Sequence, residues 1–289
     1  MKIRAPAKIN LSLRVVGRRA DGYHLLDTIM VPVSLYDDVE IHKLRRVGDE
    51  QKNAAPLIKV RCSHPLVPHG EQNLAYRAAR LLLAAAKSRQ PIEIHIRKRI
   101  PIGAGLGGGS SDAAATLVGL NRLLKLGFSA AQLERLGLKL GADVPFFIRG
   151  RPARARGIGA RLQPLGPLAR RWLVIVYPGF SVSTAWVYQN LPAKLTKLSV
   201  NTSIASSLTG SGNLAEMLVN DLESVTLGRY PKLSLLKSKL LRAGAAGSLM
   251  SGSGSSVFGV FTSKQKAEQA FRRLRQEEES QAFLVHVLN

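Results

Sequence analysis

The chain has 289 residues, 45% of them hydrophobic, and its 42 Lys and Arg against 19 Asp and Glu give a net charge of +23. This length predicts one large or two ordinary domains with a packed core. No apolar run reaches the roughly 18 residues of a membrane span, so no membrane-spanning helix is expected. The positive charge suits polyanionic or phosphorylated partners, although a basic proteome or a solvated basic surface explains it better.

The start of the chain and its cysteine content predict a cytoplasmic protein. The first residues, MKIRAPAKINLSLRV, indicate a strand and lack the apolar region and small-residue cleavage site of a signal peptide. Cys62 is the one cysteine in the sequence, so no internal disulfide can form. This is typical of a reducing compartment.

Residues 1–165 are predicted to form a first domain that begins with strands and continues with helices. Apolar and polar residues alternate over 9–15, which is typical of a half-buried strand. Further extended stretches are predicted over 25–35, 39–41, 58–62 and 92–100. Helices are predicted over 73–87 with Asn73 as N-cap, from Ser110 or Ser111 to about 126, and over 130–140 after the N-cap Ser129. Residues 141–145 are predicted to form a tight turn.

A change of composition near Gly166 and Pro167 predicts the start of a second domain, residues 166–289. Strands are predicted over 172–177, 246–250, 257–261 and 283–288. Helices are predicted over 183–188, 214–225 with Asn213 as N-cap, 231–242 and 264–278. We therefore expect a small antiparallel sheet with helices on one face, and an α+β fold for the chain.

The most informative stretch is PIGAGLGGGSSDAAATL, residues 101–117, between a predicted strand and a predicted helix. Glycine allows a backbone with φ > 0 and a close approach to a ligand. The start of a helix adds unpaired N–H groups and the positive end of the helix dipole. Together these features predict an anion site, and phosphate is the anion that they favour.

Two common phosphate motifs do not fit this stretch. The P-loop, G-x-x-x-x-G-K-[ST], matches Gly103 and Gly108 but has Gly109 where lysine is needed. The dinucleotide fingerprint G-x-G-x-x-G matches by letters, but a second helix follows the first and no acidic residue ends a strand about 20 residues on. The His-Arg-Asp and Asp-Phe-Gly signatures of protein kinases are absent.

The stretch instead resembles the phosphate-binding motif of the GHMP kinases. Two further motifs of that family have counterparts here, APAKINL at 5–11 and MSGSGSSV at 250–257, in the family's order. The resemblance covers nearly the whole chain. It implies a two-domain fold, with a ribosomal-protein-like α/β domain over 1–165 that binds ATP and a ferredoxin-like α/β sandwich over 166–289.

The resemblance also indicates an acceptor. RRADGYHLL at 18–26 and GADVPF at 141–146 are similar to the family members that act on a cytidine-bearing alcohol in the non-mevalonate isoprenoid pathway. It implies transfer of the γ-phosphate of ATP to the 2-hydroxyl of a methylerythritol moiety, with Mg²⁺ as a cofactor. A small molecule carrying a cytidine diphosphate is then the expected partner, with no nucleic acid and no membrane. The sequence indicates no particular oligomeric state.

The resemblance implies catalytic roles for Lys8 and Asp143. Asp143 would lie near the acceptor hydroxyl, as a general base or as a group that only orients the hydroxyl. Lys8 would keep Asp143 ionised and stabilise the charge that develops during phosphoryl transfer. From the residues alone, Asp143 is better explained as part of a turn before Pro145, and Lys8 as a lysine on a solvated strand face.

The resemblance also implies ligand-binding residues. The ATP phosphates would be bound by Pro101, Ile102, Gly103, Ala104, Gly105, Leu106, Gly107, Gly108, Gly109, Ser110 and Ser111, and the adenine side by Asn73, Leu74 and Lys98. The acceptor would be bound by Asn10, Tyr23, His24, Tyr188, Gly252 and Gly254, with aromatic rings stacking on cytosine. Ser111 and Asp112 are candidates for Mg²⁺, and Asp112 is equally explained by the helix dipole.

Two other functions remain open at this level. The first is a GHMP kinase that phosphorylates a different small alcohol. The charge of +23 also suits an RNA-binding protein, although aromatic residues make up only 6% of the chain and no RNP-type motif is present.

Overall fold

The computed structural model describes residues 1–45, 57–192, 218–276 and 280–289. Its contacts divide the chain into two compact units. The first comprises Met1–Ala7, Tyr36–Ile100 and Gly107–Gly150, and the second comprises Lys8–Leu35, Pro101–Leu106 and Arg151–Asn289. The fold is α+β, as predicted. The domain boundary near residue 166 stays a prediction from the sequence.

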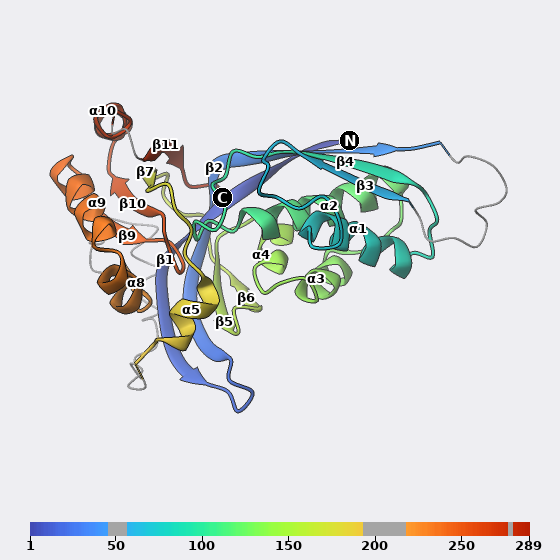
Figure 1. Cartoon of the computed structure of the whole chain (residues 1–289), viewed down its shortest axis with the longest axis horizontal. Helices are drawn as coiled ribbons and strands as arrows, with labels where there is room; N and C mark the ends of the chain where they lie inside the picture. The colour runs from blue at the N-terminus through green and yellow to red at the C-terminus, as the bar shows by residue number, and fades with distance from the viewer. Residues whose placement is uncertain (46–56, 193–217, 277–279) are drawn as a thin grey trace. The chain divides into compact units, whose positions relative to one another are not determined.

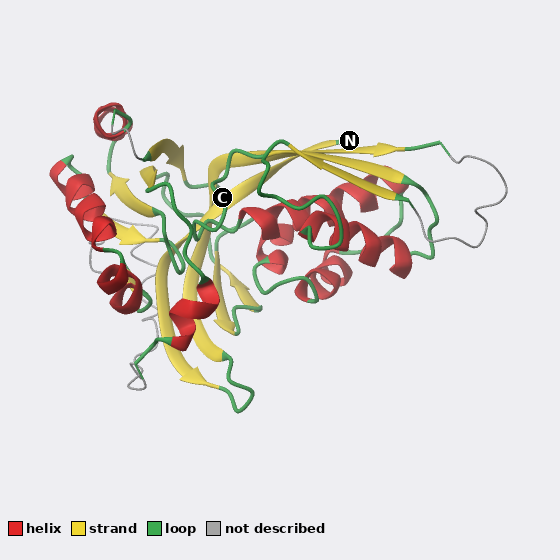
Figure 2. Cartoon of the chain, in the orientation of Figure 1, coloured by secondary structure: helices red, strands yellow, loops and turns green. Residues whose placement is uncertain are grey.

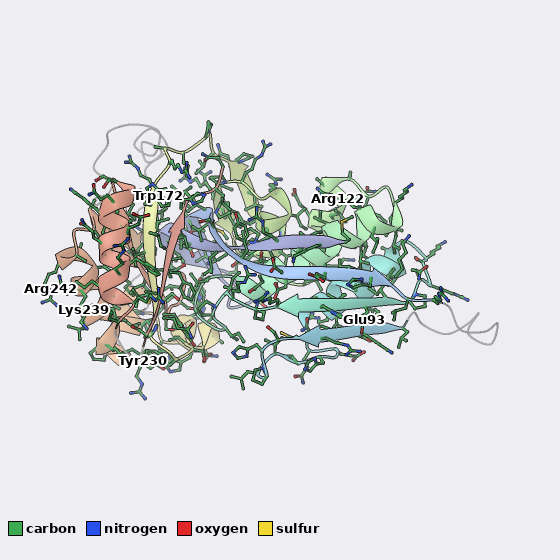
Figure 3. The ribbon with its side chains drawn as sticks, turned by 90° about the horizontal axis from the view of Figure 1, so that it is seen from above. Glu93, Arg122, Trp172, Tyr230, Lys239 and Arg242 are labelled. Carbon is green, nitrogen blue, oxygen red and sulfur yellow. The ribbon has the colours of Figure 1, made fainter. Side chains whose placement is uncertain are left out.

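The first unit is a sheet with helices on one face (Figure 2). The strands are β1 (Lys2–Arg18), β2 (His24–Lys43), β3 (Ile58–Cys62) and β4 (Ile92–Arg97), in the order β3-β4-β2-β1, where β1 and β2 also contribute to the second unit. The helices are α1 (Leu74–Ala85), α2 (Gly108–Leu124), α3 (Ala130–Leu138) and α4 (Val144–Arg149). In β4 the isoleucines at 92, 94 and 96 are buried. Glu93 alternates with them on the other face (Figure 3).

The second unit contains an antiparallel sheet in the order β11-β7-β10-β9 (Figure 1). Its strands are β7 (Trp172–Tyr177), β9 (Gly247–Met250), β10 (Val257–Phe261) and β11 (Gln281–His286). Its helices are α5 (Thr184–Gln189), α8 (Glu223–Arg229), α9 (Pro231–Arg242) and α10 (Lys264–Leu274). Leucines of α9 and alanines of α10 join valines of β7 in a buried core, which is the helix-on-sheet packing expected from their apolar periodicity.

Three short strands complete the second unit. β5 (Ala153–Gly157) and β6 (Arg161–Pro164) form a hairpin, and β5 is antiparallel to β2. β8 (Val219–Asn220) is parallel to β1. Arg154 on β5 donates to both carboxylate oxygens of Asp27 on β2, at 2.7 and 2.5 Å. Arg154 is therefore buried in a structural ion pair with Asp27.

Several element boundaries differ from the sequence prediction. The turn before Pro145 leads directly into helix α4, which was not predicted, because proline fits the first turn of a helix as well as it fits a turn. The hairpin of β5 and β6 was also missed. The helix predicted over 214–225 is wrong in part, since residues 219–220 form a strand and α8 begins at Glu223. Its predicted N-cap, Asn213, lies outside the described residues.

Among the described residues, no helix combines the length and apolar character needed to cross a membrane.

Candidate active site

The first half of the glycine-rich loop, Pro101–Leu106, lies in the second unit and is held through its carbonyl oxygens. Four consecutive carbonyls, of residues 103–106, accept hydrogen bonds of 2.9 to 3.2 Å. The donors are the N–H groups of Val182, Ser256 and Lys8 and the hydroxyl of Ser251. These bonds use the acceptor side of the loop. An anion requires its donor side, the amide N–H groups.

Gly105 and Gly252 bring two predicted motifs into direct contact. Gly105 has a φ of +75°, and a Cβ on it would lie 2.0 Å from the Ser251 carbonyl oxygen, so no other residue fits. Gly252 has a φ of +56°, and a Cβ there would lie 3.2 Å from the Gly105 oxygen and 3.4 Å from Lys8 Nζ. The turn between β9 and β10 therefore packs against the loop and beside the Lys8 ammonium.

A chain of buried polar groups orients Lys8. Its Nζ donates to Asn10 Oδ1 at 2.6 Å, and Asn10 Nδ2 donates to Thr28 Oγ1 at 2.8 Å. Thr28 Oγ1 in turn donates to the Ser12 carbonyl at 2.6 Å. This series of hydrogen bonds is protected from water, because Lys8, Asn10 and Thr28 are only 6%, 3% and 2% exposed. Lys8 is thus a buried, directed cation and not the solvated lysine of the alternative interpretation.

Asn220 fixes the turn that carries Gly252. Its Nδ2 donates to the carbonyls of Met250 and Gly252 at 2.8 Å each, and its Oδ1 accepts from the Leu222 N–H at 3.0 Å. Sequence reasoning missed both Asn220 and Thr28. The one signal available for Thr28 was a polar residue within an apolar strand, four positions after His24.

The second half of the loop belongs to the first unit and leads into α2, which begins at Gly108. Gly107 is its N-cap with a φ of +74°. A Cβ on Gly108 would lie 3.1 Å from Lys98 Nζ, and a Cβ on Gly109 would lie 3.4 Å from a methyl carbon of Leu74. Lys98 and Leu74, predicted on the adenine side, are therefore both close to the start of α2.

Lys98 lies between two buried carboxylates. Its ammonium donates to Asp37 Oδ2 and, at 2.8 Å, to Asp112 Oδ2. The three side chains are 6% exposed or less. Burial raises the pKa of the Asp112 carboxyl to about 7, with Lys98 opposing this shift and Asp37 adding to it. Sequence reasoning missed Asp37.

Asn73 acts as the helix cap that its position predicted. Its Oδ1 accepts from the Ala75 N–H at 2.8 Å, and its Nδ2 donates to the Pro68 carbonyl at 2.7 Å. These bonds give the buried side chain a structural function at the start of α1. Its role toward adenine stays a prediction.

Ser111 and Asp112 offer oxygen atoms to Mg²⁺, which prefers oxygen ligands and is usually held by one or two protein groups plus substrate phosphates. Ser111 Oγ and Asp112 Oδ1 are buried, and within the described residues neither has a hydrogen-bond partner. A hydroxyl and a carboxylate oxygen are suitable ligands in kind. No cluster of three or more His, Cys, Asp and Glu side chains suited to a metal occurs in the described chain, and an ion held mainly by nucleotide phosphates does not require one.

Asp143 is half-buried at the start of α4, immediately before Val144. The turn that leads to it packs near the end of the loop, since a Cβ on Gly141 would lie 3.8 Å from Ser110 Oγ. Asp143 makes no capping hydrogen bond to its own helix. Its position is therefore not explained by helix capping.

The aromatic residues predicted for the acceptor lie in the second unit. The rings of His24 and Tyr188 stack with centroids 5.2 Å apart and planes 27° apart. Tyr23 is 65% exposed. Burial and the nearby Arg18 lower the pKa of His24, so the ring is neutral at pH 7. A neutral imidazole both donates and accepts hydrogen bonds, as recognition of a base edge requires.

Comparison with known families identifies the class of protein. The model described as "GHMP kinases N terminal domain" matches residues 73–151, and "GHMP kinases C terminal" matches 204–280. The chain belongs to the GHMP kinase family.

Within this family, the chain is similar over nearly its full length to enzymes that share one name. The 4-diphosphocytidyl-2-C-methyl-D-erythritol kinase of Citrifermentans bemidjiense is 51% identical over 270 residues, 93% of this chain and 92% of the relative. The enzyme of the same name from Syntrophotalea carbinolica is 48% identical and covers 99% of this chain and 98% of its own. A crystal structure of 4-(cytidine 5'-diphospho)-2C-methyl-D-erythritol kinase matches over 100% of both chains, with a TM-score of 0.84 and 36% identity.

Proposed function

We propose that this chain is the ATP-dependent kinase that phosphorylates the 2-hydroxyl of 4-diphosphocytidyl-2-C-methyl-D-erythritol in the non-mevalonate isoprenoid pathway. The observation that carries the proposal is the packing of Gly252 against both Gly105 and Lys8, which joins three motifs distant in sequence. The names of relatives at 48 to 51% identity over nearly the full length support the same activity.

The glycine-rich loop binds the phosphates of ATP through its amide N–H groups and the start of α2. Its carbonyls are already bonded to other parts of the second unit, so the donors need no rearrangement when the anion binds. Phosphoryl transfer depends mainly on positioning and on electrostatic stabilisation. A loop shaped in advance provides the first of these, and Lys8 contributes to the second.

Lys8 and Asp143 act on the reacting groups. The ammonium of Lys8, directed by Asn10, stabilises the negative charge that develops on the transferred phosphoryl group. Asp143 accepts a hydrogen bond from the 2-hydroxyl and receives its proton. The acceptor oxygen then forms a bond to the γ-phosphorus while the bond to the ADP oxygen breaks.

Tyr23 and His24 bind the cytosine of the acceptor, with Tyr188 as the second aromatic residue. Tyr23 is exposed and available for stacking, and neutral His24 is suited to the base edge. Asn10, Gly252 and Gly254 line the remaining part of the acceptor site. Asn73, Leu74 and Lys98 serve the adenine side.

Mg²⁺ would be held by Ser111 and Asp112 together with the ATP phosphates, and it would neutralise phosphate charge. Ser111 Oγ and Asp112 Oδ1, which have no hydrogen-bond partner in the part of the chain that the structure describes, support this assignment. We place the reaction in the cytoplasm, which suits the free thiol of Cys62.

A coupled ADP-release assay with a panel of acceptors tests the proposal. Turnover is expected with the cytidine-bearing methylerythritol substrate and not with mevalonate or homoserine. Lys8→Ala and Asp143→Asn are each expected to reduce this turnover by at least ~100-fold while ATP still binds. Turnover of mevalonate or homoserine, with none of the cytidine substrate, would refute the proposed acceptor.

A further inference from the structure

We infer that Asp37 is a positioning residue that bonds both ends of the glycine-rich loop and thereby sets the affinity for ATP. This inference rests on the kinase function proposed above. Asp37 lies on β2, outside every motif that the sequence indicates, and its side chain is fully buried.

Asp37 bonds the chain segment that enters the loop. Asp37 Oδ1 accepts the N–H groups of Arg99 and Ile100 at 2.6 and 2.9 Å. Its Oδ2 accepts the ammonium of Lys98. One carboxylate thus bonds to three consecutive residues, the last of which directly precedes Pro101. The backbone direction at the entrance of the loop is fixed by this side chain.

The segment that leaves the loop is bonded to Asp37 through Lys98. Lys98 Nζ continues from Asp37 to Asp112 Oδ2, at 2.8 Å, in the first turns of α2. Residues 100 and 112 are therefore connected through the same ammonium and carboxylate. The intervening loop is closed at its base by Asp37–Lys98–Asp112, which we call the ion bridge.

Gly108, the first residue of α2, has little room to move against the ion bridge. A Cβ on Gly108 would lie 3.1 Å from Lys98 Nζ and 3.1 Å from Ile100 Cγ2. The backbone of Gly108 therefore packs directly on the ammonium. A shift of Lys98 displaces the first residue of α2, whose N–H group is one of those that face an anion at a helix start.

The charges of the ion bridge hold its three side chains together. The ion bridge has two carboxylates and one ammonium, all removed from water. A buried ion that loses its partner is strongly unfavourable, so the three groups hold one another in place. Removing the charge of Asp37 releases Lys98 from one of its two carboxylates.

Asp37→Asn tests the inference because it keeps the shape and the Oδ1 acceptor. Its Nδ2 group replaces the acceptor for Lys98 with a donor, so the ammonium must shift. We expect the dissociation constant of a non-hydrolysable ATP analogue, measured by titration calorimetry on the full chain, to rise roughly tenfold. This lies below the ~100-fold that a misplacement of about 1 Å can cost. The KM for ATP should rise by a similar factor, with kcat changed far less.

Asp38→Asn is the matched control. Asp38 is the next residue, and its Oδ2 accepts from Arg99 Nη2 at 2.7 Å, but the side chain of Arg99 is 46% exposed. Asp38 is itself buried, but its partner can turn toward water, so the same chemical change at this pair should leave the affinity for the analogue within about twofold.

The calorimetric readout separates positioning from folding. A defect of folding alone lowers the fraction of chains that bind and leaves the dissociation constant unchanged. That result, or equal affinities in Asp37→Asn and the wild type, would overturn the inference. The analogue binds without an acceptor, so this comparison is independent of which alcohol is phosphorylated. A wild type that binds the analogue but does not turn over the cytidine substrate would instead contradict the proposed function.

Discussion

The two halves of the glycine-rich loop are held by different interactions. Carbonyls 103–106, in the second unit, accept uncharged hydrogen bonds from main-chain N–H groups and the Ser251 hydroxyl. The second half, in the first unit, packs on a lysine between two carboxylates. The first half depends on close steric fit. The second depends on charge, so the two should respond differently to substitution and to pH.

The largest effect on turnover is expected in the first half of the loop, where the backbone fits closely around Gly105. Gly105→Ala places a methyl group where the Ser251 carbonyl lies 2.0 Å away, at a φ of +75°. Because backbone atoms cannot yield as a flexible side chain does, we expect kinase turnover to fall by at least ~100-fold.

Gly127→Ala separates this contact from the cost of the backbone conformation. Gly127 has a φ of +76°, but nothing lies within 4 Å of a Cβ there. This variant should lose about 1 kcal/mol of unfolding free energy and keep its turnover. Equal turnover in the two variants would contradict the steric account.

Lys98→Met removes the cation on which the second half of the loop packs. Burial lowers the pKa of Lys98, but Asp112 and Asp37 outweigh this and keep it raised, so the native side chain is charged. Without it, two buried carboxylates lose their cation, and the free energy of unfolding should fall by about 3–5 kcal/mol at pH 8.

The pH dependence of that loss follows from the carboxylates. Without Lys98 the pKa of Asp112, already raised by burial, rises further above its unfolded value, so protonation of this carboxyl at low pH removes much of the penalty. The loss should therefore be much smaller at pH 5 than at pH 8, as measured by urea unfolding. Exposed Lys59→Met should change stability little at either pH. An equal loss at both pH values would argue against a charge effect.

The residues predicted to bind the acceptor should respond to pH independently of both halves of the glycine-rich loop. The pKa of His24 is lowered by burial and by Arg18, so the ring is neutral at pH 7.5 and becomes charged only on acidification. We expect the KM for the cytidine substrate to rise several-fold as the pH falls toward 5, because the imidazole then loses its acceptor nitrogen. The KM in His24→Gln should vary less, and a profile as steep as that of the wild type would exclude His24 as the cause.

The smallest effect is expected for Ser251→Ala. It removes one of the four bonds to the loop carbonyls, at 2.9 Å, and leaves the backbone in place. A single uncharged hydrogen bond contributes about 1 kcal/mol, so the KM for ATP should rise by less than about fivefold. A loss as large as that in Gly105→Ala would show that the hydroxyl, and not the steric fit, determines the shape of the first half.

The sequence was informative where function depends on local residues. The resemblance of three motifs to those of a known family predicted that Gly105, Gly252 and Lys8 serve one site. The structure brings these three residues together, and their roles stay a prediction. The N-cap roles of Asn73 and Ser129 were also predictable, because a cap acts within one helical turn.

The parts that escaped prediction depend on partners distant in the chain. Asp37 meets Lys98 across 61 positions, and Asn220 meets Met250 across 30. An aspartate or asparagine at these positions has no distinctive neighbours in the sequence, so its partner emerges only with the fold. Helix α4 was missed for another reason, since Pro145 satisfies a turn and the first turn of a helix equally well.

The contact between Gly105 and Ser251 also has a consequence for biosynthesis. The two residues are 146 positions apart, and the later one shapes the earlier. During translation the N-terminal residues leave the ribosome first. The nascent chain therefore displays the complete phosphate motif long before the turn between β9 and β10 exists to give it its conformation. A chain interrupted before that turn would carry every residue of the phosphate motif without the contact that shapes Gly105.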